Sequence, residues 1–249
     1  LNRNSKKGSR KNIYAHYDIG NDFFKLWLDP SMTYSGALFK KPEEELSKAQ
    51  ENKYENILKK LNLKVGDHIL EVGCGWGGFM EYAARQGVKV TGVTISKEQY
   101  EFTKKRLSQY EGIAEVRLQD YREITGEYSQ IVSIEMFEAL GSEYWKKYFK
   151  ILHSILKPGG KMIIQTITIN NHDYSSYRRC SDFIQQYIFP GGLLPSPEIF
   201  KSTAAKQGFK YIGDFEFGLD YGLTLKRWEE NFTRVIDKVK DLGFDDKFI

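Results

Sequence analysis

The sequence predicts an α/β fold in which helices cover a doubly wound, mostly parallel sheet. Short runs rich in Val, Ile and Leu alternate with longer helical stretches, a pattern typical of βαβ units. The segment LEVGCGWGGF, residues 70–79, places four glycines between the first apolar run and a helix. A glycine-rich turn at that point is typical of doubly wound sheets that bind a ligand. The chain has 249 residues, 41% of them hydrophobic, which is enough to bury a full core.

The expected elements follow one another along the middle of the chain. We expect strands at 68–72, 88–93, 114–118, 130–134 and 161–166, and helices at 78–85, 97–110 and 142–156. A further helix is expected over 42–61, because apolar residues recur there at the spacing of one buried helical face. Its buried face is formed by Tyr54, Ile57, Leu58 and Leu61.

The pattern changes after the fifth strand. Residues 170–197 form an insertion rich in aromatic side chains. Ser196 and Pro197 then supply the N-cap and first-turn proline of another helix, and a last strand is expected over 211–217. We expect residues 1–61 to hold a basic arm and lid helices, and 62–249 to hold the ligand-binding domain, within one structural domain overall.

The charge distribution suggests a contact with anionic surfaces. Arg3, Lys6, Lys7, Arg10 and Lys11 occur without an acidic neighbour, and such a run binds anionic lipid or nucleic acid, or remains a solvated arm. The net charge of +4 is too small to predict general nucleic-acid binding, so we expect no nucleic-acid partner.

Cysteines and apolar runs limit the cellular setting. The two cysteines predict neither a disulfide framework nor a metal site, so no metal is expected. No apolar run approaches the length of about 20 residues that a membrane-spanning helix needs. We therefore expect a cytoplasmic protein.

The glycine segment leaves three ligand classes to compare. A phosphate-binding loop ends in Gly-Lys-Ser/Thr, whereas these glycines lead into Phe79 and Met80. A dinucleotide site needs an acid at the end of the second strand, and no acid follows there before Glu98. Glu71 instead precedes Gly73 and Gly75 in an E-x-G-x-G turn, which is similar to the S-adenosylmethionine motif of class I methyltransferases. A tight turn without a ligand stays open as an alternative.

Several longer motifs occur in order and carry a family resemblance. The segments HYDIGNDFFKLWLDPSMTYSGALF, LEVGCGWGG, GVTISKEQ, SIEMFEALG and RRCSDFIQQYIFPGG resemble the cyclopropane-fatty-acyl-phospholipid synthases and mycolic acid cyclopropane synthases. The resemblance covers nearly the whole chain. It implies a Rossmann-like class I methyltransferase that adds a methyl group from S-adenosylmethionine to a cis double bond of a phospholipid acyl chain, forming a cyclopropane fatty acid.

The resemblance also assigns cofactor contacts. They are Tyr34, Ser35, Gly73, Gly75, Thr94, Gln99 and Tyr121. Tyr121 and Arg122 stand where the family has Trp and Glu, so Asp120 is an alternative partner for the adenine.

The same resemblance implies a bound bicarbonate ion as the base that removes a proton after methyl transfer. The positions that hold it correspond here to Gly36, Glu138, Gln165, Ile167 and Tyr221, with Gly36 in place of Cys and Gln165 in place of His. A Gln cannot take up a proton. Two outcomes are therefore open: cyclopropanation with a modified anion site, or C-methylation that leaves a methyl or methylene branch. Glu135 lies at the same strand end, but the family pattern selects Glu138 as the active acid.

The insertion is expected to face the lipid. Its apolar residues wall an acyl-chain tunnel or form a local core; they are Phe183, Ile184, Tyr187, Ile188 and Leu193. The basic arm then docks on anionic headgroups at the inner face of the membrane, and a homodimer stays open. The rival functions are methylation of a small soluble metabolite and non-catalytic binding of lipid or cofactor.

Overall fold

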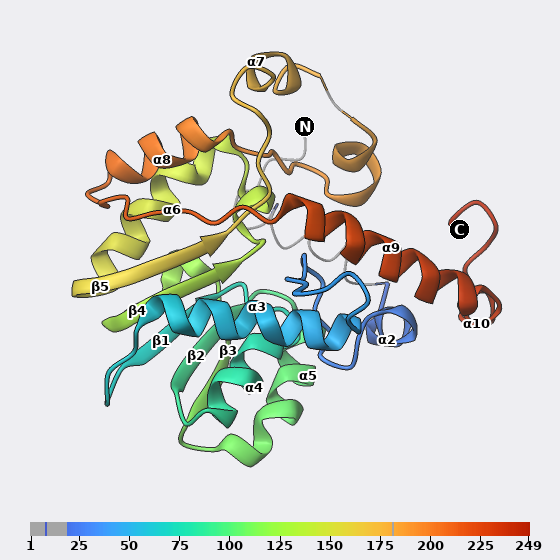
Figure 1. Ribbon diagram of the computed structural model, residues 1–249, viewed down its shortest axis with the longest axis horizontal. Helices are drawn as coiled ribbons and strands as arrows, with labels where there is room; N and C mark the ends of the chain where they lie inside the picture. The colour runs from blue at the N-terminus through green and yellow to red at the C-terminus, as the bar shows by residue number, and fades with distance from the viewer. Residues whose placement is uncertain (1–7, 9–18, 181) are drawn as a thin grey trace.

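The computed structural model describes residues 8, 19–180 and 182–249. The five basic arm residues, Arg3, Lys6, Lys7, Arg10 and Lys11, lie outside the described residues. The described chain contains a parallel sheet with the order β3-β2-β1-β4-β5 (Figure 1). Its strands are β1 (His68–Val72), β2 (Lys89–Thr94), β3 (Ala114–Leu118), β4 (Tyr128–Ile134) and β5 (Leu156–Gln165). This is the doubly wound parallel sheet that the sequence predicts.

The strand order reverses between β1 and β4, which pair in parallel. Loops that leave adjacent strands in opposite directions open a crevice at the carboxyl edge of such a sheet. The glycine segment follows β1 directly, and the segment around Glu135 and Glu138 follows β4. The topology therefore brings these two segments to the same crevice.

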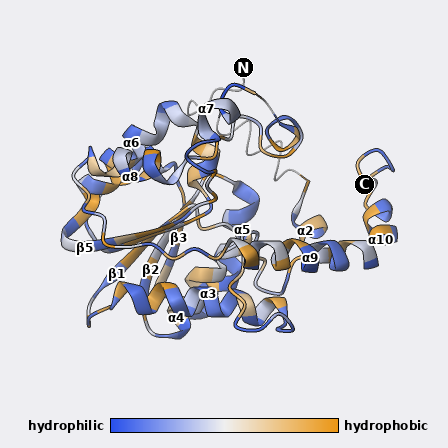
Figure 2. Ribbon diagram, turned by 45° about the horizontal axis from the view of Figure 1, so that its top comes forward, coloured by the Kyte–Doolittle hydropathy of each residue, from blue (hydrophilic) through white to orange (hydrophobic). Residues whose placement is uncertain are grey.

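Helices cover both faces of the sheet (Figure 1). One apolar cluster joins the strands to α3 and α4, and a second joins them to α6 and α8. The strands are mainly apolar, whereas the surrounding helices alternate apolar and polar residues (Figure 2). These helices and α5 span Leu46–Leu61 (α3), Gly78–Arg85 (α4), Lys97–Arg106 (α5), Ser142–Ile155 (α6) and Pro197–Ala205 (α8).

The remaining elements lie at the carboxyl edge or connect the layers. Short 3-10 turns are η1 (Leu107–Tyr110), η2 (Tyr121–Glu123) and η3 (Phe137–Leu140), and the insertion contains α7 (Tyr174–Tyr177) and the π-helical turn η4 (Ile184–Ile188). The chain begins its described lid with α2 (Asn21–Trp27) and ends with α9 (Gly218–Arg234) and α10 (Ile236–Asp241). No helix among the described residues has the length and hydrophobicity to cross a membrane.

A third apolar cluster fixes the lid. It joins α2 to α9 through aromatic contacts, including Trp27 with Trp228 at 5.8 Å between ring centroids. Phe24 of α2 also contacts Trp76 of the glycine segment, with 4.9 Å between ring centroids. The lid therefore packs on the last long helix and on the expected cofactor loop together.

Most predicted boundaries are confirmed within a few residues, and one predicted element is wrong. The helix expected from 42 begins at Leu46, and β5 begins five residues before the expected 161. The strand expected over 211–217 does not form. Tyr211 lies over the Lys201 ammonium, which also binds Asp214 at 2.8 Å, so side chains tie this segment to α8. Ile212 stays 72% exposed, which is incompatible with a buried strand.

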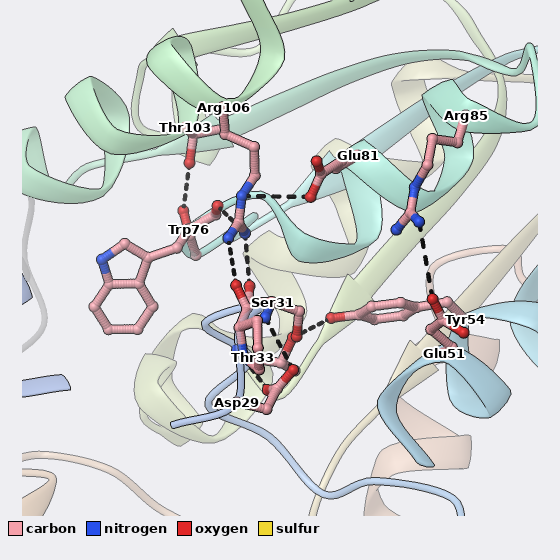
Figure 3. Close-up of polar contacts among 12 residues, drawn as sticks. Asp29, Ser31, Thr33, Glu51, Tyr54, Trp76, Glu81, Arg85, Thr103 and Arg106 are labelled. Atoms are coloured by element: carbon pink, nitrogen blue, oxygen red, sulfur yellow. Dashed lines mark hydrogen bonds and ion pairs between the residues drawn. The ribbon is translucent and has the colours of Figure 1, made fainter. Parts of the chain in front are cut away.

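The loop between α2 and α3, residues 28–45, is called the lid loop below. The Arg106 guanidinium fastens it to the glycine segment after β1 (Figure 3). Arg106 donates to the carbonyls of Ser31 at 2.6 Å, Trp76 at 2.9 Å and Pro30 at 3.0 Å. Its side chain is only 10% exposed, and its Nε lies 3.5 Å from the Glu81 carboxylate. A planar group with five donors meets these acceptors at once, which a lysine ammonium cannot do with the same geometry.

We expect Arg106→Lys to lower the free energy of unfolding by about 1–3 kcal/mol, because buried carbonyls lose their donors while the charge is kept. Urea denaturation at neutral pH measures the change. Arg85→Lys is the matched control, since Arg85 is exposed and only 3.8 Å from Glu51; its effect should stay below about 0.5 kcal/mol. Equal losses in the two variants would contradict the role given to Arg106.

Candidate active site

The carboxyl ends of all five strands contribute to one site. The loops after β1, β2 and β3 carry most residues expected to bind the cofactor, and those after β4 and β5 carry the expected catalytic residues. The lid loop adds Tyr34, Ser35 and Gly36, and α9 adds Tyr221. The structure thus brings together residues that lie far apart in the sequence.

The glycine loop has the shape that an S-adenosylmethionine site needs. Gly73 has φ 79°, and a Cβ there would lie 2.6 Å from Met136 Cγ, so no side chain fits. Gly75 also has a positive φ, of 53°, with open space around it. Before this turn, Glu71 is 2% exposed, and its Oε2 has no hydrogen-bond partner among the described residues. An open glycine turn beside an unsatisfied buried carboxylate fits the amino-acid end of the cofactor.

The expected adenosine side is pre-organised by side-chain contacts. Thr94 Oγ1 donates to Gln99 Oε1 at 2.8 Å, which holds the two predicted residues together. Asp120 instead receives a bidentate pair from Arg122, at 2.8 Å to Oδ1 and 2.6 Å to Oδ2. Tyr121 is buried against Tyr148. The Asp120 carboxylate is therefore already bound by Arg122, which stands where the family has Glu.

Glu135 is the centre of the site's hydrogen bonds. Its Oε1 accepts from the Gly36 backbone N–H at 2.9 Å and from Gln165 Nε2 at 2.7 Å. Its Oε2 accepts from the Tyr221 hydroxyl at 3.2 Å. These three donors are the groups that the resemblance assigns to a bound anion. In this chain they hold a carboxylate of the protein itself.

Glu135 is not among the predicted site residues, because the family pattern points to Glu138. One local signal was available: Glu135 is a charged residue directly after a buried strand. The backbone there has φ 48°, a conformation that non-glycine residues rarely adopt. The hydrogen bonds to the side chain compensate for this strain and direct the carboxylate toward the lid.

Glu138 lies beside this centre in a different environment. Its Oε1 accepts from the Ile167 backbone N–H, and its Oε2 has no partner among the described residues. Burial, reinforced by the Glu135 charge, raises the pKa of Glu138 to about 8. Burial also raises the pKa of Glu135, but Lys53 and its three hydrogen-bond donors oppose that rise. At neutral pH the pair therefore favours an ionised Glu135 and a protonated Glu138.

One part of the insertion, residues 170–197, contacts the site, and another part is exposed to solvent. Leu193 N–H donates to the Glu138 carbonyl at 2.9 Å, and the Phe189 ring lies 6.3 Å from that of Tyr34. Phe183, Ile184 and Tyr187 are instead 65%, 50% and 71% exposed. Those three form an open apolar surface rather than a buried lining, whereas Ile188 and Leu193 are partly buried.

The site offers bases and hydrogen-bond donors but no metal ligand set. Within residues 8, 19–180 and 182–249, no group of three His, Cys, Asp or Glu side chains is placed to hold a metal ion. The arrangement can bind an S-adenosyl group, hold a carboxylate in one orientation and accept one proton beside a buried apolar wall.

The sequence matches a known family and curated proteins over almost its full length. Residues 4–249 match the sequence pattern of the family described as mycolic acid cyclopropane synthetase. The tuberculostearic acid methyltransferase UfaA1 of Mycobacterium tuberculosis is 38% identical over 98% of this chain and 60% of that protein. The cyclopropane-fatty-acyl-phospholipid synthase of Escherichia coli K12 is 37% identical over 100% of this chain and 63% of that protein. The chain thus spans about three fifths of these two relatives.

The structure is similar to solved cyclopropane synthases. Mycolic acid cyclopropane synthase CmaA1, solved with S-adenosylhomocysteine and CTAB, matches with a TM-score of 0.89 and 32% identity, covering 96% of this chain and 88% of that one. A coclaurine N-methyltransferase matches with a TM-score of 0.74 at 19% identity, which shows the shared fold alone.

We expect the contribution of Glu138 to the free energy of unfolding to fall as the pH rises from about 5 to 9. Glu138 has a pKa of about 8 in the folded protein against 4.5 for the free side chain, so the folded state binds its proton more tightly. Stability from this group is full below the unfolded pKa and is lost as the pH passes the folded pKa.

Urea denaturation across this pH range tests the prediction with Glu138→Gln, which mimics the protonated acid. The variant should gain on the order of 1–3 kcal/mol relative to the wild type between pH 5 and pH 9. Parallel pH curves for the two proteins would show that Glu138 is not protonated in the folded state.

Proposed function

This chain belongs to the mycolic acid cyclopropane synthetase family of S-adenosylmethionine-dependent methyltransferases, and from that premise we propose its reaction. We propose that the protein transfers a methyl group to the double bond of an unsaturated phospholipid acyl chain. The proposal is supported by relatives named for cyclopropane and fatty-acid methylation. The observation that carries its mechanism is the Glu135 carboxylate in a cradle of three donors.

Glu135 is the proposed base, in place of the bicarbonate that the family resemblance implies. Its carboxylate occupies the donors of Gly36, Gln165 and Tyr221, so a separate anion has none of these three groups free. The substitution of Gln for His is consistent with this role. Gln165 only donates a hydrogen bond to the base, and it does not need to carry a proton.

When bound, S-adenosylmethionine supplies an electrophilic methyl group. The alkene π electrons would form the bond to that methyl as its bond to sulfur breaks, which would leave positive charge on the other alkene carbon. Glu135 then removes a proton from the added methyl, and the released electron pair closes the three-membered ring. The Tyr221 ring carries the hydroxyl that donates to this carboxylate, and its face can stabilise the cation.

The same cation has a second outcome. If Glu135 instead removes the proton on the methylated carbon, the released electron pair forms a double bond to the cationic carbon and a methyl-branched alkene remains. If that hydrogen first migrates with its electron pair to the cationic carbon, the charge moves to the methylated carbon, and loss of a proton from the methyl group leaves a methylene branch. The observation that favours keeping this candidate is the 38% identity to a relative named tuberculostearic acid methyltransferase, against 37% to a cyclopropane synthase. Product analysis separates the two outcomes.

The substrate is proposed to arrive from the inner face of a membrane. The exposed surface of Phe183, Ile184 and Tyr187 belongs to the insertion that contacts Tyr34 and Glu138 at its other end. An acyl chain lifted at this surface would reach the site along the insertion, through Phe189 and Leu193. The basic arm is the proposed partner of anionic headgroups.

We expect the wild type, given S-adenosylmethionine and vesicles of cis-monounsaturated phospholipid, to add one CH2 to the acyl chains without added bicarbonate. Mass spectrometry before and after mild hydrogenation distinguishes a ring, which resists hydrogen, from a branched alkene. Glu135→Ala should lower the rate at least about 100-fold, because the base is lost. Bicarbonate should restore part of that rate, since it can occupy the emptied cradle.

Glu135→Gln is the matched control for this rescue. It fills the cradle without a base, so bicarbonate should not restore its activity. A wild type that depends on bicarbonate would overturn the role of Glu135, and methylation without any lipid would favour the soluble-metabolite alternative. Cofactor binding without any turnover would favour the alternative of a non-catalytic protein that binds lipid or cofactor.

We expect Phe183→Ser with Tyr187→Ser to weaken binding to both neutral and anionic vesicles, because exposed apolar area is removed. Neutralising the five arm residues should weaken binding to anionic vesicles only. Vesicle sedimentation measures both effects, and the control is Tyr211→Ser, another exposed aromatic outside the insertion. Unchanged sedimentation of the insertion variant would exclude its proposed contact with lipid.

A further inference from the structure

Lys53 is a buried cation to which the proposed reaction gives no role. It lies in α3 and is 2% exposed, and its Nζ donates to Ser35 Oγ at 2.6 Å. Burial lowers the pKa of Lys53 to about 8, and nearby carboxylates oppose a larger fall, so the ammonium group is mainly charged at pH 7. Keeping a charge buried is costly unless it stabilises another charge. The position of Lys53 therefore calls for an anion on which it acts.

Two side chains on one face of α3 hold the lid loop at Ser35. Lys53 binds the hydroxyl of Ser35, and Gln50, three residues earlier in the helix, donates from Nε2 to its carbonyl at 2.9 Å. The next residue of the lid loop is Gly36, whose backbone N–H donates to Glu135 Oε1 at 2.9 Å. A single residue of the lid loop thus joins Lys53 to the donor that binds the proposed base.

The Glu135 carboxylate is held by donors that carry no charge. They are the Gly36 backbone N–H, the Gln165 amide and the Tyr221 hydroxyl. Neutral donors orient a carboxylate, whereas a nearby positive charge also stabilises its ionised form. Burial raises the pKa of Glu135, and Lys53 is the cation that opposes this rise.

The other titratable groups around the pair are acids and phenols. They are Glu138 beside Glu135, Asp29 and Glu71 on the side of Lys53, the Tyr221 hydroxyl on Glu135, and the Tyr54 ring beside the Lys53 ammonium. An ionised acid at any of these positions disfavours a second negative charge on Glu135, and a neutral phenol does not offset it. Lys53 is therefore the group that can balance the charge of the base.

We propose that Lys53 is a positioning residue for the base: it fixes the Gly36 N–H through Ser35, and its charge keeps the Glu135 carboxylate ionised. The inference rests on the proposed function, in which Glu135 accepts the proton. It adds a role for a side chain on α3 that touches neither the carboxylate nor the reacting carbons. Loss of the charge should therefore change the pH at which the base works, and not only the rate.

Infrared titration of the protein without cofactor tests the effect on Glu135 independently of turnover. The measurement uses Glu138→Gln protein, so that the coupled pair is reduced to one titrating carboxyl. The absorption of a protonated carboxyl that disappears when Glu135→Gln is added identifies Glu135. Adding Lys53→Met to Glu138→Gln should move the titration of this absorption to higher pH by about one unit.

The rate of methyl transfer to cis-monounsaturated phospholipid vesicles, at saturating S-adenosylmethionine, tests the consequence. In otherwise wild-type protein, Lys53→Met should move the acidic side of the pH–rate profile to higher pH by about one unit, because a protonated Glu135 cannot act as a base. The rate should be about tenfold below that of the wild type on the acidic side and recover at higher pH.

Two matched variants separate charge from position. Lys53→Arg keeps the charge, so its titration and its pH–rate profile should stay within about 0.3 units of the wild type. Gln50→Met removes the other contact of α3 with Ser35 without changing any charge. It should lower the rate by a similar factor at every pH and leave both titrations in place. Circular dichroism verifies folding, and Lys53→Gln replaces Lys53→Met as the neutral variant if the latter does not fold.

Two results would overturn the proposal. If the neutral variant of Lys53 lowers the rate equally at every pH and Glu135 titrates as before, Lys53 has only a structural role. If Gln50→Met shifts the titration as far as the neutral variant does, the charge of Lys53 is not the cause. A failure of the proposed function is distinct from both: the infrared shift would be present, but the wild type would methylate no acyl chain.

Discussion

The attachment of the lid loop to the sheet edge is the constraint on which the site depends. Tyr34, Ser35 and Gly36 belong to no helix or strand, so their positions are set by contacts with other elements. Arg106 holds the preceding carbonyls, and the Thr33 and Tyr54 hydroxyls hydrogen-bond to each other on the opposite side (Figure 3). Because Arg106 also holds the Trp76 carbonyl, one side chain sets the distance between the lid and the glycine turn.

The site gathers several ionisable side chains at the carboxyl edge of the sheet. Glu71 and Lys53 are buried at the carboxyl edge, and Glu135 and Glu138 are partly buried beside them. Backbone and side-chain donors satisfy some of their atoms and leave others open. Burying charge in this way reduces stability unless a partner is present. The cost is consistent with a site prepared for a charged ligand and for a carboxylate that must accept a proton.

The fold was largely predictable from the sequence, because the period of apolar residues reports directly on strands and helices. The strand expected over 211–217 does not form. Alternating aromatic residues indicate a strand only when a neighbouring strand is available to pair with the segment. The expected cofactor residues come from the glycine motif and the family resemblance, and they stay a prediction. Glu135 comes from neither, because its role depends on Gly36, Gln165 and Tyr221 meeting in space from three distant segments. Neither spacing nor residue type reveals such a convergence.

Gly36 has a consequence for how this site can change. A Cβ at that position would lie 2.4 Å from Cδ2 of the Tyr221 ring, so no side chain fits while that ring stays in place. Tyr221 in turn donates to Glu135. Introducing the cysteine that related enzymes carry at position 36 therefore displaces a ligand of the carboxylate at position 135. One form of the anion site has Gly36 and the Glu135 carboxylate, and the other has a cysteine at position 36 and a separate anion. Because Tyr221 contacts both positions, a library intended to interconvert the two forms must vary positions 36, 135 and 221 together.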